Sequence, residues 1–256
     1  MLSREALIDT VHAGDCLEVM ADWPDGLADL CYVALPSPEE WRWDAAAARR
    51  LDRIQRQARN LGHDTVLGLH IALGDVGTIA YLAFVAERLP ALKRVLKPTG
   101  SLCVVGDTHA GHYAKVLLDA FFGASNLRGE IIWGPCGTEP EQIDSHHSAT
   151  WYANDDAHRT DRPTPVVIVA ADGTQGGSGG ALALAKRVIA ATTDHGDVVL
   201  DPFCGDALAA SAARELGRSA IAIDASAKAH SAGREVGAPL RAGARTSTFA
   251  SRRPRT

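Results

Sequence analysis

Apolar and polar positions follow one another along this chain in a way that predicts short strands separated by helices. Residues 29–33 (DLCYV) form a compact apolar run typical of a buried strand, and the runs SLCVV and TPVVIVAA have the same character. Residues 181–193 carry apolar side chains at helical spacing, as does the segment DTHAGHYAKVLLDAFFG. This alternation predicts an α/β fold, a Rossmann-like, mostly parallel and doubly wound sheet.

Local signals place further elements within this pattern. The N-terminal run TVHAGDCLEVMADWP predicts a strand, a turn at Gly14-Asp15 and a helix that ends near Pro24. An Ala/Arg-rich helix is expected over residues 45–60, and a turn over residues 98–100. The apolar stretch 63–73 is compatible with either a helix or a strand.

The domain organisation follows from the same signals. Residues 1–235 are expected to form one domain, and the Arg-rich residues 236–256 a flexible tail. Residues 134–164 are polar and lack periodicity, so they are expected to be irregular.

Composition narrows the class of protein. No apolar run reaches the length of a membrane span, and the N-terminus lacks a signal-peptide core, so a cytoplasmic location is expected. The net charge of −5 argues against coating nucleic acid by bulk charge alone. The 5 cysteines have no close pairs, so no disulfide framework is expected, and no metal site is predicted from them or from the histidines.

The segment VVLDPFCGDALAASAARELGRSAIAID carries the strongest chemical signal. It predicts a strand ending at Asp201, a tight turn, a helix, and a second strand ending at Asp224. A helix N-terminus after such a turn suits an anionic group, and an acid about twenty residues later is placed to accept hydrogen bonds from ribose hydroxyls. By spacing alone, the segment indicates a nucleoside site or a purely structural βαβ unit.

The sequence of this segment resembles the cofactor motif of amino-group DNA methyltransferases, which methylate adenine N6 or cytosine N4. HAGDCLEVMADWPDGLADLCYV is similar to the opening of that family, and RLPALKRVLKPTGSLCVVGD to its centre. The catalytic strand comes first and the cofactor motif last, the β-type motif order. The resemblance implies an AdoMet-dependent methyltransferase fold, DNA methylation of the kind used in restriction–modification, and S-adenosyl-L-methionine (AdoMet) as cofactor. Residues 134–164 then occupy the place of a target-recognition region.

The catalytic turn departs from the family. Where the family has an acid, Asn or Ser followed by Pro-Pro-aromatic, this chain has Ala34-Leu35-Pro36-Ser37. The resemblance implies that the first residue orients the target amine and that the aromatic ring stacks on a flipped-out base. Ala34 has no acceptor and Ser37 has no ring. A frame shifted to start at Ser37 also lacks the ring and lengthens the strand.

The turn that follows Asp201 departs as well. The family's Gly-Ser-Gly-Thr corresponds to Gly205-Asp206-Ala207-Leu208. Ala207 replaces a glycine where the backbone should approach the cofactor, and Asp206 brings a negative charge to the expected place of the AdoMet carboxylate, where it could also cap the helix. The family's cofactor-binding positions that are retained are Asp15, Asp201, Phe203, Gly205 and Asp224.

Aromatic residues next to the catalytic turn suggest contact with nucleic acid. Trp41 and Trp43 could stack on bases while Arg42 contacts phosphate, or they could cover the sheet edge. The leading hypothesis is a degenerate methyltransferase, impaired or inactive (a pseudoenzyme), that binds DNA or supports an active subunit or a second copy of itself. The alternatives are an active enzyme whose main-chain carbonyls orient the amine, and an interaction module without a ligand.

Overall fold

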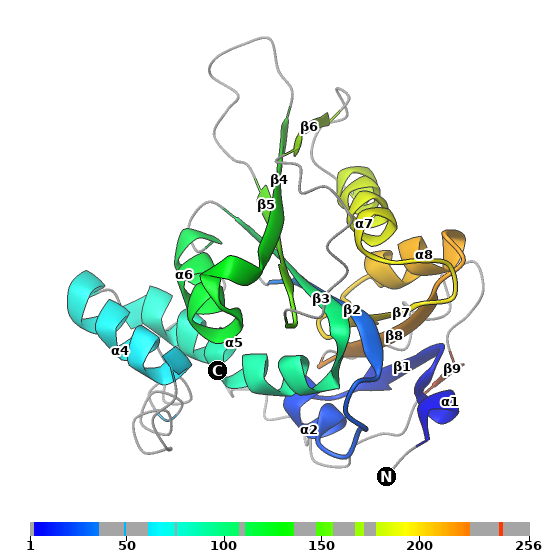
Figure 1. Cartoon of the computed structure of the whole chain (residues 1–256), viewed down its shortest axis with the longest axis horizontal. Helices are drawn as coiled ribbons and strands as arrows, with labels where there is room; N and C mark the ends of the chain where they lie inside the picture. The colour runs from blue at the N-terminus through cyan, green and yellow to red at the C-terminus, as the bar shows by residue number, and fades with distance from the viewer. Residues whose placement is uncertain are drawn as a thin grey trace, which may run out of the picture.

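The computed structural model describes residues 3–35, 49, 61–74, 76–107, 111–135, 147–155, 167–171, 178–225 and 241–242. Within these residues the centre of the molecule is a 9-stranded sheet in the order β6-β4-β5-β3-β2-β7-β8-β1-β9 (Figure 1). The strands are β1 (Thr10–Ala13), β2 (Ala28–Ala34), β3 (Leu96–Asp107), β4 (Leu127–Pro135), β5 (His147–Ala153), β6 (Val167–Ala171), β7 (Val198–Asp201), β8 (Ser219–Asp224) and β9 (Arg241–Ala242).

Helices cover both faces of the sheet (Figure 1). One apolar core lies between the sheet and a layer that contains α2, α4, α5 and α6, and the other lies beneath α7 and α8. The helices are α1 (Arg4–Leu7), α2 (Cys16–Met20), α4 (Leu61–Leu73), α5 (Val76–Val95), α6 (Gly111–Phe122), the 3-10 turn η2 (Ala124–Asn126), α7 (Ser178–Thr192) and α8 (Leu208–Glu215). The doubly wound α/β fold predicted from the sequence is therefore confirmed.

The two faces differ because side chains alternate along each strand. In β8, Ile221 and Ile223 point into the core beneath α5, whereas Ala220 and Ala222 face α8. The buried face of α8 is itself alanine, at Ala209, Ala210, Ala212 and Ala213. Small side chains on both surfaces let this helix pack close to the sheet, next to the turn that precedes it.

Several expectations need correction. The prediction of an irregular segment was wrong for residues 147–153, which form β5 and pair antiparallel with both β3 and β4. The turn expected at residues 98–100 lies within β3, where the register against β2 shifts between Ala28 and Leu30. Part of the expected tail is also ordered, since Arg241–Ala242 pairs in parallel with β1.

Other expectations are confirmed or lie outside the described residues. The ambiguous stretch 63–73 belongs to helix α4. Apart from residue 49, which is helical, the helix expected over residues 45–60 lies outside the described residues. None of the helices in the described ranges is long and apolar enough to span a membrane.

The sheet topology sets the place of a ligand site. From β2 the chain continues to β3 on one side, whereas β7 is followed by β8 on the other, so the strand order reverses between β2 and β7. Ligands of open α/β sheets bind outside the carboxyl ends of the strands at such a reversal. Both predicted turns, the one after β2 and the one after β7, begin at this point.

Candidate functional site

Acidic residues follow or end three neighbouring strands at one edge of the sheet. Asp224 ends β8 and Asp201 ends β7, while Asp15 comes just after β1. The register pairs Ala13 with Asp224 and Asp201 with Ala222. Because these strands are parallel, their carboxyl ends lie at the same edge, beside the end of β2. The structure thus brings the sequence-predicted cofactor residues together.

The turn after β7, residues 201–207, is fastened to β8 by its own backbone. The N–H of Cys204 donates to the carbonyl of Ile223 at 2.9 Å. The N–H of Gly205 donates to the Asp224 carboxylate at 2.8 Å, and that of Phe203 donates to the Asp201 carboxylate at 3.1 Å. Each of these acids therefore stabilises the turn, whatever ligand it also meets.

Asp201 lies in a strongly desolvated position, with 3% of its surface exposed. Burial raises the pKa of its carboxyl group from 3.8 to about 7, the N–H of Phe203 acts in the opposite direction, and the nearby negative charge of Asp224 adds to the rise. Asp201 consequently titrates near neutrality, which suits a structural acid better than a fixed anionic acceptor.

The buried cysteines are not nucleophiles. Cys31, Cys103 and Cys204 are fully or nearly buried, and burial raises the pKa of each thiol well above its ordinary value. They act as small core residues. In the part of the chain that the structure describes, no cluster of His, Cys, Asp and Glu could hold a metal ion.

Asp15 caps the helix that follows β1. Its Oδ1 accepts a hydrogen bond from the N–H of Leu17 at 2.9 Å, as an N-cap residue does. Its Oδ2 accepts from Nη2 of Arg88 on α5 at 2.5 Å. The Asp15 side chain remains 30% exposed, so this anchored carboxylate still reaches the surface at the strand ends.

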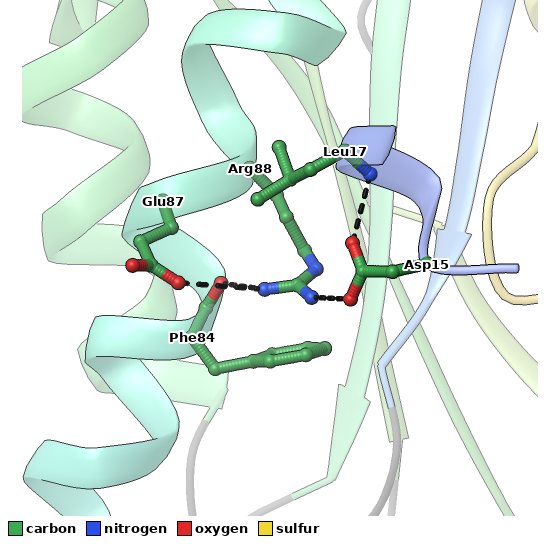
Figure 2. Close-up of polar contacts among 5 residues, drawn as sticks. All are labelled: Asp15, Leu17, Phe84, Glu87 and Arg88. Carbon is green, nitrogen blue, oxygen red and sulfur yellow. Dashed lines mark hydrogen bonds and ion pairs between the residues drawn. The ribbon is translucent and has the colours of Figure 1, made fainter. Parts of the chain in front are cut away.

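Arg88 is a residue that the sequence interpretation missed. Its side chain is 4% exposed, its guanidinium carbon lies 3.5 Å from the centre of the Phe84 ring, and Nη1 donates to the Phe84 carbonyl at 3.0 Å. Figure 2 shows this side chain reaching from α5 to Asp15, with the Phe84 ring beside it. The available signal was an arginine within the apolar run AYLAFVAERLPAL, four residues after an aromatic residue.

The catalytic turn is described only at its start. Ala34 ends β2 and pairs with Val105 of β3. The next residue, Leu35, donates its N–H to the carbonyl of Val105 at 2.9 Å and packs against the core beneath α5. Pro36 and Ser37 lie outside the described residues, as do the predicted nucleic-acid contacts Trp41, Arg42 and Trp43.

In the turn after β7, an alanine adopts a backbone conformation that is typical of glycine. Ala207 is fully buried and adopts φ 56° and ψ 32°, a left-handed conformation that non-glycine residues rarely occupy. This residue, and not Asp206, is the N-cap of α8, and it provides no side-chain hydrogen bond. The cap that Asp206 could have provided is therefore not formed at the N-cap position. Asp206 is exposed instead.

These residues fit one part of AdoMet better than the other. The anchored carboxylates of Asp15 and Asp224 end neighbouring strands, and a Cβ built on Gly205 would meet no atom within 4 Å, so a nucleoside has acceptors and room there. The resemblance implies that the amino-acid part lies at the start of α8, where the exposed Asp206 would place a second negative charge near its carboxylate. The residues present therefore fit the nucleoside part of AdoMet, whereas the charge of Asp206 disfavours the carboxylate of its amino-acid part.

Comparison with known proteins gives a family match around the turn after β7. Residues 181–235, from α7 to beyond β8, match the family model of DNA methylases of the N6 and N4 type. This match confirms the resemblance to amino-group DNA methyltransferases over the cofactor segment. Strand β2, which the resemblance implies to be the catalytic strand, precedes that segment in the chain, in agreement with the β-type motif order.

Solved structures share the fold across most of the chain. A putative DNA modification methylase from Thermus thermophilus is 22% identical, with a TM-score of 0.57, covering 91% of this chain and 98% of that one. The cytosine-N4-specific PvuII DNA methyltransferase is 15% identical, with a TM-score of 0.58 and coverages of 87% and 83%. M1.HpyAVI, solved with SAM, is 16% identical, with a TM-score of 0.53 and coverages of 88% and 97%. These similarities confirm the predicted methyltransferase fold.

Proposed function

We propose that this chain, a DNA methyltransferase-like protein with the cofactor segment of the N6/N4 family, is impaired or inactive in methyl transfer. In this proposal it retains a nucleoside site and acts as a DNA-binding or structural partner, for an active methyltransferase subunit or for a second copy of itself. A cytoplasmic location is part of the same proposal.

The observation that carries this proposal is the end of β2. The strand ends beside β7, at the reversal of strand order where open α/β sheets generally bind ligands, and its last residue is Ala34. A methyl side chain accepts no hydrogen bond, so it cannot orient the amino group of a base. Leu35 turns its side chain to the core and uses its N–H in the β3 ladder. This corner is built as an extension of the sheet and carries no acid, base or amide side chain.

The cofactor side supports binding more than it supports transfer. The acids at the ends of β1 and β8 are held in place by backbone N–H groups, and the exposed face of Gly205 leaves room for a close approach. Asp15 and Asp224 would hold the nucleoside, and Phe203 would support it from the turn. AdoMet, when bound, would supply the methyl group for transfer. Asp206 would oppose its carboxylate and weaken that complex relative to adenosine.

A second candidate, an active enzyme with an unusual catalytic turn, has one observation in its favour. The retained cofactor residues are held in place by hydrogen bonds. The N–H groups of Phe203 and Gly205 donate to the acids at the ends of β7 and β8, and Asp15 caps α2. Main-chain carbonyls alone would then orient the amine. The two candidates differ in whether the missing acceptor side chain at Ala34 limits methyl transfer. In the first candidate it does, and in the second it does not.

Calorimetry followed by reversion separates them. The purified protein is titrated with adenosine, AdoMet and its demethylated product. Then Ala34→Asp, Leu35→Pro and Ser37→Tyr are combined, with and without Asp206→Ser and Ala207→Gly, and methyl transfer to DNA is measured. The proposal expects adenosine to bind more tightly than AdoMet, and it expects activity only when both turns are reverted. Activity of the unsubstituted protein supports the second candidate, and a large gain from the first three changes alone contradicts the role assigned to Asp206 and Ala207.

A further inference from the structure

Two side chains of α5 connect the two turns of the candidate site. Phe84 and Arg88 lie one helical turn apart on the same face of the helix, where i and i+4 side chains meet. Arg88 contacts Asp15, just after β1, through its guanidinium. The Phe84 ring lies 5.6 Å, centre to centre, from the ring of Phe203 in the turn after β7. A continuous line of contacts therefore runs from Asp15 through α5 to Phe203.

The burial of Arg88 makes this line specific. A guanidinium that is 4% exposed needs a compensating charge and hydrogen bonds, because an unpaired buried charge is strongly destabilising. Asp15 provides the charge, and the carbonyl and ring of Phe84 provide the other contacts. Glu87 is more distant, 3.9 Å from Nη1. Asp15 and Phe84 thus fix the position of the Arg88 side chain, which lies between them.

The contacts also fix the direction of the Asp15 carboxylate. One oxygen is held by the Leu17 N–H and the other by Arg88, so the group cannot rotate without losing a charge-assisted hydrogen bond. Its exposed part remains available as an acceptor for an amine or hydroxyl of a ligand. A rigid acceptor binds a donor with a smaller loss of entropy than a mobile one.

We propose that Arg88 and Phe84 are positioning residues, which hold the acceptor Asp15 and the aromatic ring of Phe203 at a fixed spacing for a nucleoside. This inference rests on the nucleoside site of the proposed function and adds the part of the chain that sets its geometry. Loss of the Arg88 contacts releases Asp15 directly and, through Phe84, loosens the turn that carries Phe203.

The test uses a matched pair of arginines on α5. Arg94 also connects α5 to the α2 region, but it contacts the opposite end of that helix. It donates to the carbonyls of Met20, the last residue of α2, and of Trp23, and it pairs with the exposed Asp25. Arg88→Met and Arg94→Met each remove a guanidinium from the same helix. Hydrogen exchange is measured over residues 15–21 and 201–208, and the binding of adenosine is measured by calorimetry.

Arg88→Met is expected to speed exchange in both segments and to weaken adenosine binding about tenfold, whereas Arg94→Met changes that affinity less than about twofold. Arg88→Lys keeps the charge but loses the planar stack and fork, so it should fall between the unsubstituted protein and Arg88→Met. If Arg88→Met folds poorly, the double change Asp15→Asn with Arg88→Met removes both charges. That variant should restore stability without restoring affinity.

Equal affinities of Arg88→Met and Arg94→Met for adenosine would overturn the positioning role. So would unchanged exchange over residues 201–208 in Arg88→Met, since the proposed connection through Phe84 predicts a change there. If the unsubstituted protein does not bind adenosine, the nucleoside site itself is overturned, and the exchange rates alone then decide whether the two turns are connected.

Discussion

The N–H of Gly205 donates to the carboxylate of Asp224 at 2.8 Å, and this contact joins the turn after β7 to the end of β8. The backbone carbonyl of Asp224 also accepts from the N–H of Gly14 at 3.0 Å. Asp224 thus holds the turns that follow β7 and β1, the two strands on either side of β8. An acid predicted to meet a ligand also has a structural role here, so substitutions at Asp224 will change stability and binding together.

Asp224→Ala is expected to lower the free energy of unfolding by about 1–3 kcal/mol, because the Gly205 N–H loses its charged acceptor. Adenosine binding should be lost in the same variant. Urea unfolding and calorimetry measure the two effects. Asp206→Ala is the control, since that exposed side chain is expected to change stability by no more than about 0.5 kcal/mol. Equal stabilities of the two variants would contradict the role of Asp224 in the turn.

Asp206 is predicted to control the preference between ligands with and without a carboxylate. Asp206→Ser removes the negative charge next to the start of α8. We expect AdoMet to bind about two- to fivefold more tightly in this variant, while adenosine binding stays the same. Titration of both ligands at low ionic strength gives the ratio. A parallel change in both affinities would mean that Asp206 acts on the shape of the turn and not on the carboxylate.

Leu35 carries a backbone contact that proline cannot make. Leu35→Pro removes the N–H that donates to Val105, in addition to the packing of the side chain. Leu35→Ala removes the packing alone. We expect the proline variant to be less stable than the alanine variant by about 1 kcal/mol, the net value of a typical hydrogen bond. A proline variant as stable as the alanine variant would show that this corner accepts the family's Pro-Pro pair without loss.

Much of the fold was predictable because its signals are local. Gly14-Asp15 marks a turn through a glycine at positive φ and the N-cap acid. The run around Asp201 repeats the strand–turn–helix–strand order of the family. Strand β5 was missed because HSATWYA has short polar residues and is defined by antiparallel pairing with β3 and β4 on its two sides. Pairing of that kind leaves little trace in a local pattern.

The candidate site was predictable only in part, for the same reason. The acids at the strand ends could be identified because the ends of parallel strands meet at one edge. Arg88 could not, because its role depends on how α5 lies against α2 and on the position of the Phe84 ring. The left-handed conformation of Ala207 was indicated only by the glycine that the family has at this position, since an alanine by itself gives no sign of positive φ.

Asp201 predicts a specific pH dependence of stability. The folded protein holds the proton of this carboxyl up to about pH 7, whereas the unfolded chain releases it near 3.8. Its contribution is therefore complete below the lower value and is lost as the pH rises through the higher one. Asp201→Asn cannot titrate, but it keeps an oxygen for the Phe203 N–H.

The stability of Asp201→Asn relative to the unsubstituted protein should accordingly rise with pH between about 4 and 7 and then level off, with a slope of at most about 1.4 kcal/mol per pH unit. Urea unfolding at intervals across this range measures it. A difference that stays constant with pH would show that Asp201 is ionised in the folded protein throughout.

The most direct test of the central claim is methyl transfer itself. The unsubstituted protein, in excess over potential target sites, is incubated with radiolabelled AdoMet and DNA of genomic complexity, which contains every short sequence. Labelled N6-methyladenine and N4-methylcytosine are then separated and counted. The account predicts no label above that of the heat-denatured protein. Near-stoichiometric labelling of either base within minutes would contradict it, and would show that the corner at Ala34 and Leu35 supports catalysis without an acceptor side chain.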